Sequence, residues 1–383
     1  MTHSSDSQRL TSLDVFRGAT IAGMNLVNNP GDWGNIYAPF KHASWNGWTY
    51  TDTIFPFFLW IVGVAMTLSF AKRVERGDDR GKLFKHVAVR SAIIFAVGLF
   101  LSGFPFGLAF GHHFSFAGIR IPGVLQRIAV CYLAASAIYL TTGIAGQVRW
   151  LVSLLGVYWL AMKLIPVPGF GPSVWEPMGN LCGYIDSTLL AGHTWSGAPA
   201  PGFDPEGIFS TLPAVATTLF GILTGHFLRV NVGREERTAW MFTVGCIVLL
   251  VGLIMDNWLP INKNLWTSSY AVLMAGLALV CFACCHWLID IKGHKTWSKP
   301  FEIYGLNALT MFVLAGLIGR LTTVIKWTQV DGTAISFKTF YYKNLFLSWA
   351  DPMAASLLHS LFFVVMLYGI AHVMYKRKWF VKI

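Results

Sequence analysis

A histidine, two tryptophans, an asparagine and an aspartate gather directly before a long apolar run, in the stretch PFKHASWNGWTYTDTIFPFF. Histidine is the residue type best suited to take a proton from an attacking nucleophile near neutral pH, so His42 could act as a base, while Trp45, Asn46 and Asp52 could hold a substrate. Asn28 precedes this stretch and can donate hydrogen bonds. The same residue types are typical of a membrane interface, where tryptophan lies at headgroup level and an aspartate caps a helix. The stretch therefore indicates either a reaction centre at a membrane surface or an interfacial belt.

The segment GIRIPGVLQRIAV holds a second concentration of polar residues, Arg120, Gln126 and Arg127. Arg127 lies inside an apolar stretch, where an unpaired guanidinium is costly, so it requires a carboxylate or phosphate partner. One interpretation pairs Arg127 with Asp14 or Asp52. The other gives it an anionic ligand.

Two further polar groups lie beside apolar runs. In LPINKNLWTSSY, Lys263 and Asn264 are either an ordinary snorkelling anchor or ligand contacts. In GFDPEGIFSTLPA, Asp204 and Glu206 belong to a turn in an acidic loop rich in Gly and Pro, which would attract a cationic substrate such as an amine. Acidic outer loops also follow from the tendency of basic residues to stay in the cytoplasm, so this signal has a topological explanation as well.

Transmembrane helices must position these residues. The chain has 383 residues, of which 55% are hydrophobic and 12% charged, and its mean hydropathy is +0.55; soluble domains carry about 25% charged residues. A span needs about 20 mostly apolar residues. The predicted fold is therefore all-α, a polytopic integral membrane protein of one domain (residues 1–383) with about ten transmembrane helices. The spans are predicted at residues 11–29, 52–71, 87–106, 123–141, 149–166, 208–228, 239–257, 266–288, 301–320 and 354–375.

The positions of basic residues predict the orientation. With both termini in the cytoplasm, 19 of the 29 Lys and Arg residues fall on cytoplasmic segments, and none lies between Lys163 and Arg229, around the long loop after the fifth span. The formal net charge of +11 is thus explained by topology, and no nucleic-acid partner is predicted. This orientation places the loop with His42 on the outer, non-cytoplasmic face.

Several other classes of site are not indicated. The polar start of the chain predicts no cleaved signal peptide. The six cysteines give no disulfide framework, and the cluster CFACC lacks a second pair of zinc ligands. His112, His113 and His193 show neither i,i+4 spacing nor carboxylate partners, so no metal site is predicted. The chain contains no GxSxG elbow, glycine-rich phosphate loop or HExxH motif.

Five segments together resemble the catalytic domain of the heparan-α-glucosaminide N-acetyltransferases. In chain order they are RLTSLDVFRGATIAGMNLVN, FKHASWNGWTYTDTIFPFFLWIVG, IRIPGVLQRIAVCY, FDPEGIFSTLPA and INKNLWTSSY. The chain is similar to the compact bacterial branch, which lacks the large luminal N-terminal domain and includes members labelled as transporters linked to N-acetylglucosamine use. The resemblance implies a multi-pass protein of the bacterial inner membrane with cytoplasmic termini.

The resemblance also implies an activity, the movement of an acetyl group from cytosolic acetyl-CoA across the membrane to the amine of a terminal glucosamine, without a metal. The active-site histidine of the family matches His42, its asparagine before that loop matches Asn28, and its arginines match Arg120 and Arg127. We extend the expected contacts with acetyl-CoA to Gln126 and Lys263, and those with the acceptor to Asp52, Trp45, Asn46, Asn264, Asp204 and Glu206.

In this hypothesis His42 acts as the general base that deprotonates the amine, or as a transiently acetylated nucleophile, and Asn28 orients it or stabilises the thioester oxygen. Two alternatives stay open. An amino-sugar transporter would use the same residues to line a pathway, and an O-acyltransferase would modify a surface or cell-wall glycan by the same chemistry. The expected partners are the lipid bilayer and an amino-sugar or glycan acceptor, with a homodimer left open.

Overall fold

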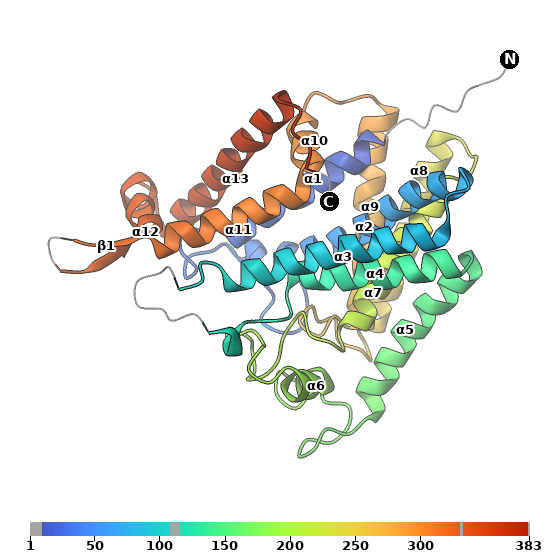
Figure 1. Ribbon diagram of the computed structural model, residues 1–383, viewed down its shortest axis with the longest axis horizontal. Coiled ribbons are helices and arrows are strands. Elements are labelled where there is room, and N and C mark those ends of the chain that lie inside the picture. Colours follow the sequence, from blue (N-terminus) through green and yellow to red (C-terminus); the bar gives the residue numbers. More distant parts are fainter. Residues whose placement is uncertain (1–9, 108–114, 330–331, 382–383) are drawn as a thin grey trace.

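The computed structural model describes residues 10–107, 115–329 and 332–381, and nearly all of its regular structure is helical (Figure 1). The longer helices are α1 (Thr11–Asn28), α2 (Tyr50–Glu75), α3 (Arg80–Gly103), α4 (Val124–Thr141), α5 (Ile144–Leu164), α7 (Thr211–Phe227), α8 (Arg234–Met255), α9 (Ser268–Cys285), α11 (Ala308–Val324) and α13 (Pro352–Lys376). The shorter elements are η1 (Ala38–Phe40), η2 (Phe116–Gly118), α6 (Leu181–Leu189), η3 (His286–Ile291), α10 (Lys299–Leu306), β1 (Lys326–Thr328), β2 (Ala334–Ser336), α12 (Phe337–Tyr342) and η4 (Lys343–Leu347). The two strands form an antiparallel hairpin.

Helices occupy all ten positions predicted as membrane spans, and the all-α membrane class is confirmed. Within the described residues, seven helical segments are long and apolar enough to cross a bilayer: α2, α3, α4, α5, α8, α9 with η3, and α13. The pair α10–α11 would make an eighth. Helix α7 has only 17 residues, and polar residues such as Asp14 and Arg17 interrupt α1. The predicted count of ten spans is therefore not confirmed.

The segment predicted as one ninth span is a broken helix. Helices α10 and α11 meet at Asn307 with a bend of 83°, because the backbone of Asn307 is not helical there (φ −123°, ψ 37°). Its amide Nδ2 donates to the carbonyl of Trp379 at 3.1 Å, and its Oδ1 accepts from the N–H of Val381 at 3.0 Å. Asn307 thus holds the backbone of Trp379 and Val381 against the bend between α10 and α11.

Close backbone contacts hold α1 against α10. Arg17 pairs with Asp14, as the i,i+3 spacing allows, with Nη1 and Oδ1 3.2 Å apart. A Cβ atom on Gly18 would lie 1.7 Å from the carbonyl oxygen of Phe301, and one on Gly305 would lie 2.0 Å from that of Asp14. Only glycine allows the two helices to approach so closely.

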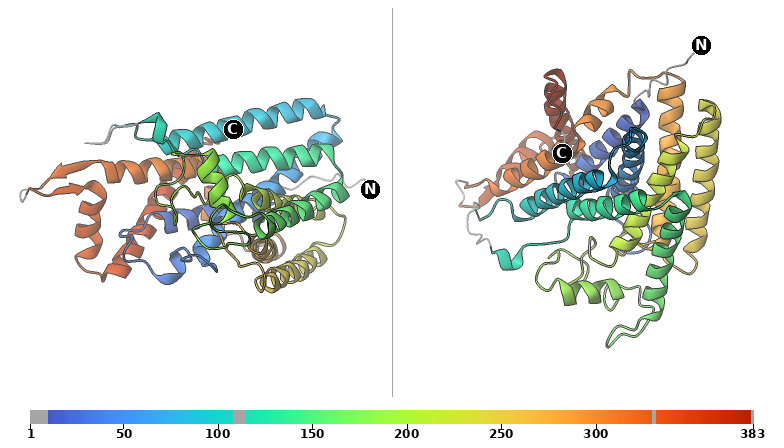
Figure 2. Two further views of the ribbon diagram at one scale, coloured as in Figure 1. Left: turned by 90° about the horizontal axis from the view of Figure 1, so that it is seen from below. Right: turned by 45° about the vertical axis from the view of Figure 1, so that its right-hand side comes forward.

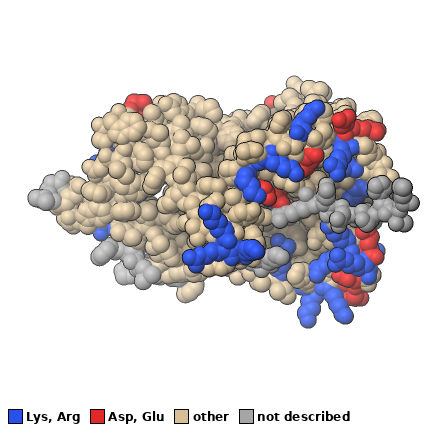
Figure 3. Space-filling model, turned by 90° about the horizontal axis from the view of Figure 1, so that it is seen from above, with Lys and Arg blue, Asp and Glu red and all other residues tan. Residues whose placement is uncertain are grey.

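The two ends of the helices differ in charge. In Figure 1 the connections α2–α3, α4–α5 and α7–α8 lie toward the right-hand end, whereas the chain after α3 and the hairpin lie at the left, and Figure 2 shows the same separation. Most of the Lys and Arg side chains visible in Figure 3 gather over the right-hand end. This separation agrees with the alternation of basic loops, and the orientation in a membrane stays a prediction.

Helices α2 and α9 form the centre of the bundle. Of the residues in their apolar segments, 72% and 61% are buried, against 22% in both α5 and α8. Trp266, just before α9, packs edge-on against Phe55 of α2 with ring centroids 5.0 Å apart. Both central helices begin at the loops that carry His42 and Lys263, so well-buried helices support these loops.

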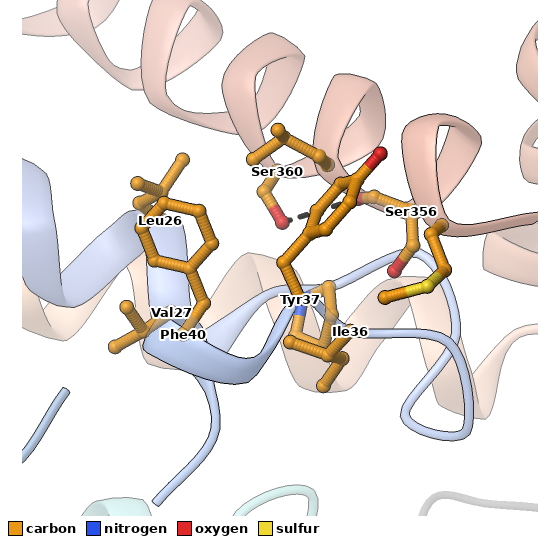
Figure 4. Close-up of a pocket in the computed structure, with 10 residues that line it drawn as sticks. Leu26, Val27, Ile36, Tyr37, Phe40, Ser356 and Ser360 are labelled. Atoms are coloured by element: carbon orange, nitrogen blue, oxygen red, sulfur yellow. Dashed lines mark hydrogen bonds between the residues drawn. The ribbon is translucent and has the colours of Figure 1, made fainter. Parts of the chain in front are cut away.

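The segment that leads to His42 is fastened to α13. Ser356 accepts from the N–H of Asp32 through its Oγ at 3.1 Å, and its carbonyl accepts from Gly31 at 3.2 Å. Beside these bonds Tyr37 and Phe40 pack against the start of α13 (Figure 4), around a void of only about 10 Å³. This space is no larger than one water molecule, so the contact is packing and not a ligand site.

We predict that Gly63→Ala destabilises the protein by about 1–3 kcal/mol, the usual cost of overpacking. A Cβ atom on Gly63 of α2 would lie 2.1 Å from the carbonyl oxygen of Thr218 on α7, a backbone atom that cannot rotate away. Thermal unfolding of the purified protein in detergent measures the effect. The control is Gly156→Ala on α5, where nothing lies within 4 Å. Equal midpoints for the two variants would show that α2 and α7 are not in backbone contact.

Candidate active site

His42 lies between η1 and α2, and a carboxylate holds its imidazole. Nδ1 of His42 is 2.6 Å from Oδ1 of Asp52, while Oδ2 of Asp52 accepts from the N–H groups of Ala43 and Thr49, both at 3.0 Å. The side chain of Asp52 is 1% exposed and that of His42 is 50% exposed. Because the ionised carboxylate only accepts, Nδ1 carries the proton of the neutral ring, and the lone pair of Nε2 stays available. The half-exposed ring can therefore accept a proton at Nε2.

The start of α2 explains why Asp52 occupies this position. Thr49 and Asp52 form a capping box, in which each side chain bonds to the backbone N–H of the other residue. The buried hydroxyl of Tyr270, on α9, donates to the backbone carbonyl of Asp52 at 2.5 Å. Asp52, expected to contact substrate, thus lies behind the histidine and orients it. The spacing T-x-x-D signals the cap, but the contact with His42 depends on the path of the loop.

Trp45 and Asn46, also expected to contact substrate, fasten the loop to its neighbours. Trp45 donates its Nε1–H to the carbonyl of Trp175 at 2.8 Å and packs edge-on against Phe203, with ring centroids 5.8 Å apart. Oδ1 of Asn46 accepts from Nδ2 of Asn262 at 3.1 Å. Both side chains therefore hold the histidine loop in place.

Arg120 forms a bidentate ion pair with Asp204. Its Nε and Nη2 donate to the two carboxylate oxygens at 2.8 and 2.6 Å, and Nη2 also donates to Glu206. The guanidinium lies 5.5 Å from the ring centroid of Trp195. Asp204 is fully buried. A phosphate would have to compete with two carboxylates for this guanidinium, so the first role of Arg120 is to hold the turn at 204–206.

Asp186, an acidic residue of the same loop that was not among the predicted site residues, organises the same turn from its other side. Its Oδ1 accepts from the N–H of Ile208 at 2.9 Å and its Oδ2 from that of Asp204 at 3.3 Å. A Cβ atom on Gly207 would lie 1.9 Å from Oδ2, so glycine is required there. Burial raises the pKa of Asp186 to about 6, although the two backbone N–H groups oppose this shift.

Arg127 is buried, with 2% of its surface exposed. Its Nη2 donates to the carbonyl of Gly207 at 3.0 Å and to the hydroxyl of Ser210, and the guanidinium lies 5.2 Å from the ring centroid of Trp266. Its Nε and Nη1 have no partner in the part of the chain that the structure describes. The ion pairs proposed with Asp14 or Asp52 are absent among these residues, because the guanidinium points into the turn before α7.

Lys263 connects the two charged groups. It interacts electrostatically with the carboxylates of Asp52 and Glu206. Burial alone would raise the pKa of Glu206, but the positive charges of Arg120 and Lys263 outweigh it, and the pKa is lowered. Asn264 follows in the same loop and is partly buried.

A cavity of about 590 Å³ begins beside Arg120, and Asn28 and Gln126 also line it. Gln126 donates from Nε2 to Oγ of Ser102 at 3.4 Å. The predicted residues thus fall into two neighbouring groups, one around His42 and the other on this wall. The wall also includes four polar side chains that the sequence patterns did not single out, Arg320, Lys338, Tyr341 and His359.

The described residues contain no group of three or more His, Cys, Asp or Glu side chains that could hold a metal ion. Nδ1 of His193 bonds to the carbonyl of Ile119 at 2.8 Å. His112 and His113 lie outside the residues that the structure describes.

Comparison with known proteins gives one family. The model of the catalytic region of heparan-α-glucosaminide N-acetyltransferase matches residues 9–261. Two curated relatives carry that name. The protein of Homo sapiens is 29% identical over 353 residues, which cover 80% of this chain and 52% of the relative. The protein of Mus musculus is 28% identical over 360 residues, which cover 82% and 54%. The chain therefore spans about half the length of the curated relatives it matches.

We predict that Asp186→Asn removes a pH dependence of stability between about pH 4 and about pH 6. The pKa of Asp186 is raised from 3.8 to about 6 in the folded protein. Folding thus favours the protonated form, whose contribution is complete below about pH 4 and is lost as the pH rises through about 6. Thermal unfolding at about pH 5 and about pH 7 should show a loss of stability for the wild type that the variant lacks.

The control for this measurement is Glu176→Gln, which removes an exposed carboxylate from the same loop. It should keep the pH dependence of the wild type. If Asp186→Asn and Glu176→Gln both follow the wild type, Asp186 is ionised in the folded protein throughout this range.

Proposed function

Because the chain belongs to the heparan-α-glucosaminide N-acetyltransferase family, we propose that it is a membrane-bound enzyme that moves an acetyl group from acetyl-CoA to the amine of a glucosamine-type sugar. The observation that carries the proposal is the pair His42–Asp52, a half-exposed histidine held by a buried carboxylate within the matched residues. The acceptor is taken from the names of the human and mouse relatives.

His42 is the general base in this proposal. The amine nitrogen attacks the thioester carbonyl carbon, so that an N–C bond forms and the C–S bond breaks. The proton lost by the amine goes to Nε2 of His42, and from there to the leaving thiolate, which restores the neutral imidazole. Asp52 keeps the proton on Nδ1 and stabilises the imidazolium that forms in between.

The neighbouring residues support the two substrates. Asn28 lines the cavity and, in this proposal, donates to the thioester oxygen as charge develops on it. Gln126 lies on the same wall. Arg120 lines the cavity but already holds two carboxylates, and Arg127 is buried outside the cavity lining, so neither guanidinium is placed to take a donor phosphate in this arrangement.

The reaction would take place at the outer face of the membrane with cytoplasmic acetyl-CoA. The gathering of Lys and Arg at one end of the helices supports cytoplasmic termini. The loop of His42 then lies on the outer side, in a bacterial inner membrane. The turn of Asp204 and Glu206 lies close by, joined to it through Lys263.

We predict that His42→Ala lowers the rate of acetyl transfer by about 10²–10⁴-fold, the usual contribution of a general base. The assay uses purified protein in detergent with acetyl-CoA and glucosamine, and follows the release of free CoA and the formation of N-acetylglucosamine. His294→Ala, in an exposed loop, is the control and should keep the wild-type rate. Full activity of His42→Ala would refute the assigned role. Uptake of labelled sugar into vesicles without acetylation would favour a transporter.

We predict that Asp52→Asn lowers kcat by at least about tenfold and displaces the pH profile, with little change in KM, because an amide does not hold the same tautomer of His42. The variant also weakens the cap of α2. Thr49→Ala separates the two effects, since it removes the hydroxyl that completes the capping box and bonds to the carbonyl of Lys41 and to Oδ2 of Asp52, but keeps the Oδ1 of Asp52 that contacts His42. It should cost about 1 kcal/mol of stability and keep kcat. Equal kcat losses in the two variants would mean that Asp52 acts through the helix end alone.

A further inference from the structure

Two cations on the C-terminal part of the chain face the cavity beside Arg120. Arg320 lies near the end of α11 and Lys338 on α12, and both belong to the lining of the space of about 590 Å³. Neither lies in the residues 9–261 that match the family model. The lining residues in the described part of the chain include no Asp or Glu.

The bonding of these two cations differs from that of Arg120. Nη1 of Arg320 donates to the carbonyl of Gly316 at 3.0 Å, one turn earlier on the same helix. In the part of the chain that the structure describes, neither Arg320 nor Lys338 forms an ion pair, whereas Arg120 forms two. Lys338 has a longer-range interaction with Asp32, which does not line the cavity. The two positive charges thus line a cavity whose described lining residues include no carboxylate.

Glycines keep the wall of α11 open. A Cβ atom on Gly316 would lie 3.0 Å from Nη1 of Arg320, and one on Gly319 would lie 2.9 Å from Oδ1 of Asn29. The helix therefore has no side chain at these two positions, and the guanidinium of Arg320 lies directly against the backbone of Gly316.

Two neutral groups next to these cations bond to one another. The hydroxyl of Tyr341 lies 2.5 Å from Nε2 of His359, whose Nδ1 lies 3.0 Å from the carbonyl of Asn29. The carbonyl can only accept, so Nδ1 carries the proton, and Tyr341 donates to Nε2. The O–H of Tyr341 is therefore not a donor to a ligand, whereas Arg320 and Lys338 are charged donors on the same wall.

We propose that Arg320 and Lys338 bind an anionic group of a ligand, a phosphate in particular, inside this cavity. A guanidinium and an ammonium make short charge-assisted hydrogen bonds to phosphate oxygens, and both prefer this partner to a neutral one. The proposal rests on the proposed function for the choice of ligand. The phosphate belongs either to the acyl donor or to a phosphorylated amino-sugar acceptor.

The test is direct binding, by calorimetry in detergent, of four probes: CoA, phosphate-free pantetheine, glucosamine 6-phosphate and glucosamine. The variants are Arg320→Gln, Lys338→Gln and the double variant. The control is Lys326→Gln, which removes the same charge from the exposed hairpin outside the cavity. We expect each single variant to weaken one phosphate-bearing probe by about tenfold or more, and its phosphate-free counterpart hardly at all.

If the variants lose affinity only for CoA, the bound phosphate belongs to the acyl donor. If they lose affinity only for glucosamine 6-phosphate, it belongs to the acceptor. The proposal is overturned if the cavity variants bind both phosphates as Lys326→Gln does, or if the wild type binds neither. Binding needs no turnover, so these outcomes are independent of whether acetyl transfer is found. If the wild type transfers acetyl and the cavity variants bind both phosphate-bearing probes normally, the proposed phosphate site is refuted and the proposed function stands.

Discussion

The buried carboxylate of Asp52 is the constraint on which the site depends. One side chain caps α2, fixes the proton of His42 on Nδ1 and accepts two backbone N–H groups of the same loop. Its backbone carbonyl is held by Tyr270, so the central helices α2 and α9 meet at the same residue. A shift at the start of either helix would therefore move the imidazole. His42 is thus placed by the most buried part of the bundle, although it lies on a loop.

The acidic residues of the loop between α5 and α7 act as internal supports. Asp186 and Asp204 are fully buried, and their carboxylates accept from the backbone of the loop that contains them or from Arg120. A carboxylate neutralised in this way produces little field at the surface, so it would attract an amine only feebly. Outside helix α6 the segment between α5 and α7 has almost no regular structure, and these hydrogen bonds from carboxylates stabilise its path.

The sequence predicted what periodicity and composition determine, the ten helical positions and the membrane class. It did not predict the bend at Asn307, since an apolar run looks the same whether or not one residue leaves the helix. For the site, the motifs pointed to His42, and the stretch around it also contained Asp52. The contact between them depends on the path of the loop between η1 and α2. Arg320 and Lys338 were missed because a basic residue near a span end is usually an anchor, and only the fold brings these two to one cavity.

Arg120 explains how the loop and the cavity depend on one another. Its guanidinium holds the turn of Asp204 and Glu206, and the same side chain forms part of the cavity wall. That turn folds around Asp186, and the charge of Lys263 acts on the carboxylates of both Glu206 and Asp52. Because Arg120 belongs to both the turn and the wall, the cavity wall is complete only when the loop before α7 is folded.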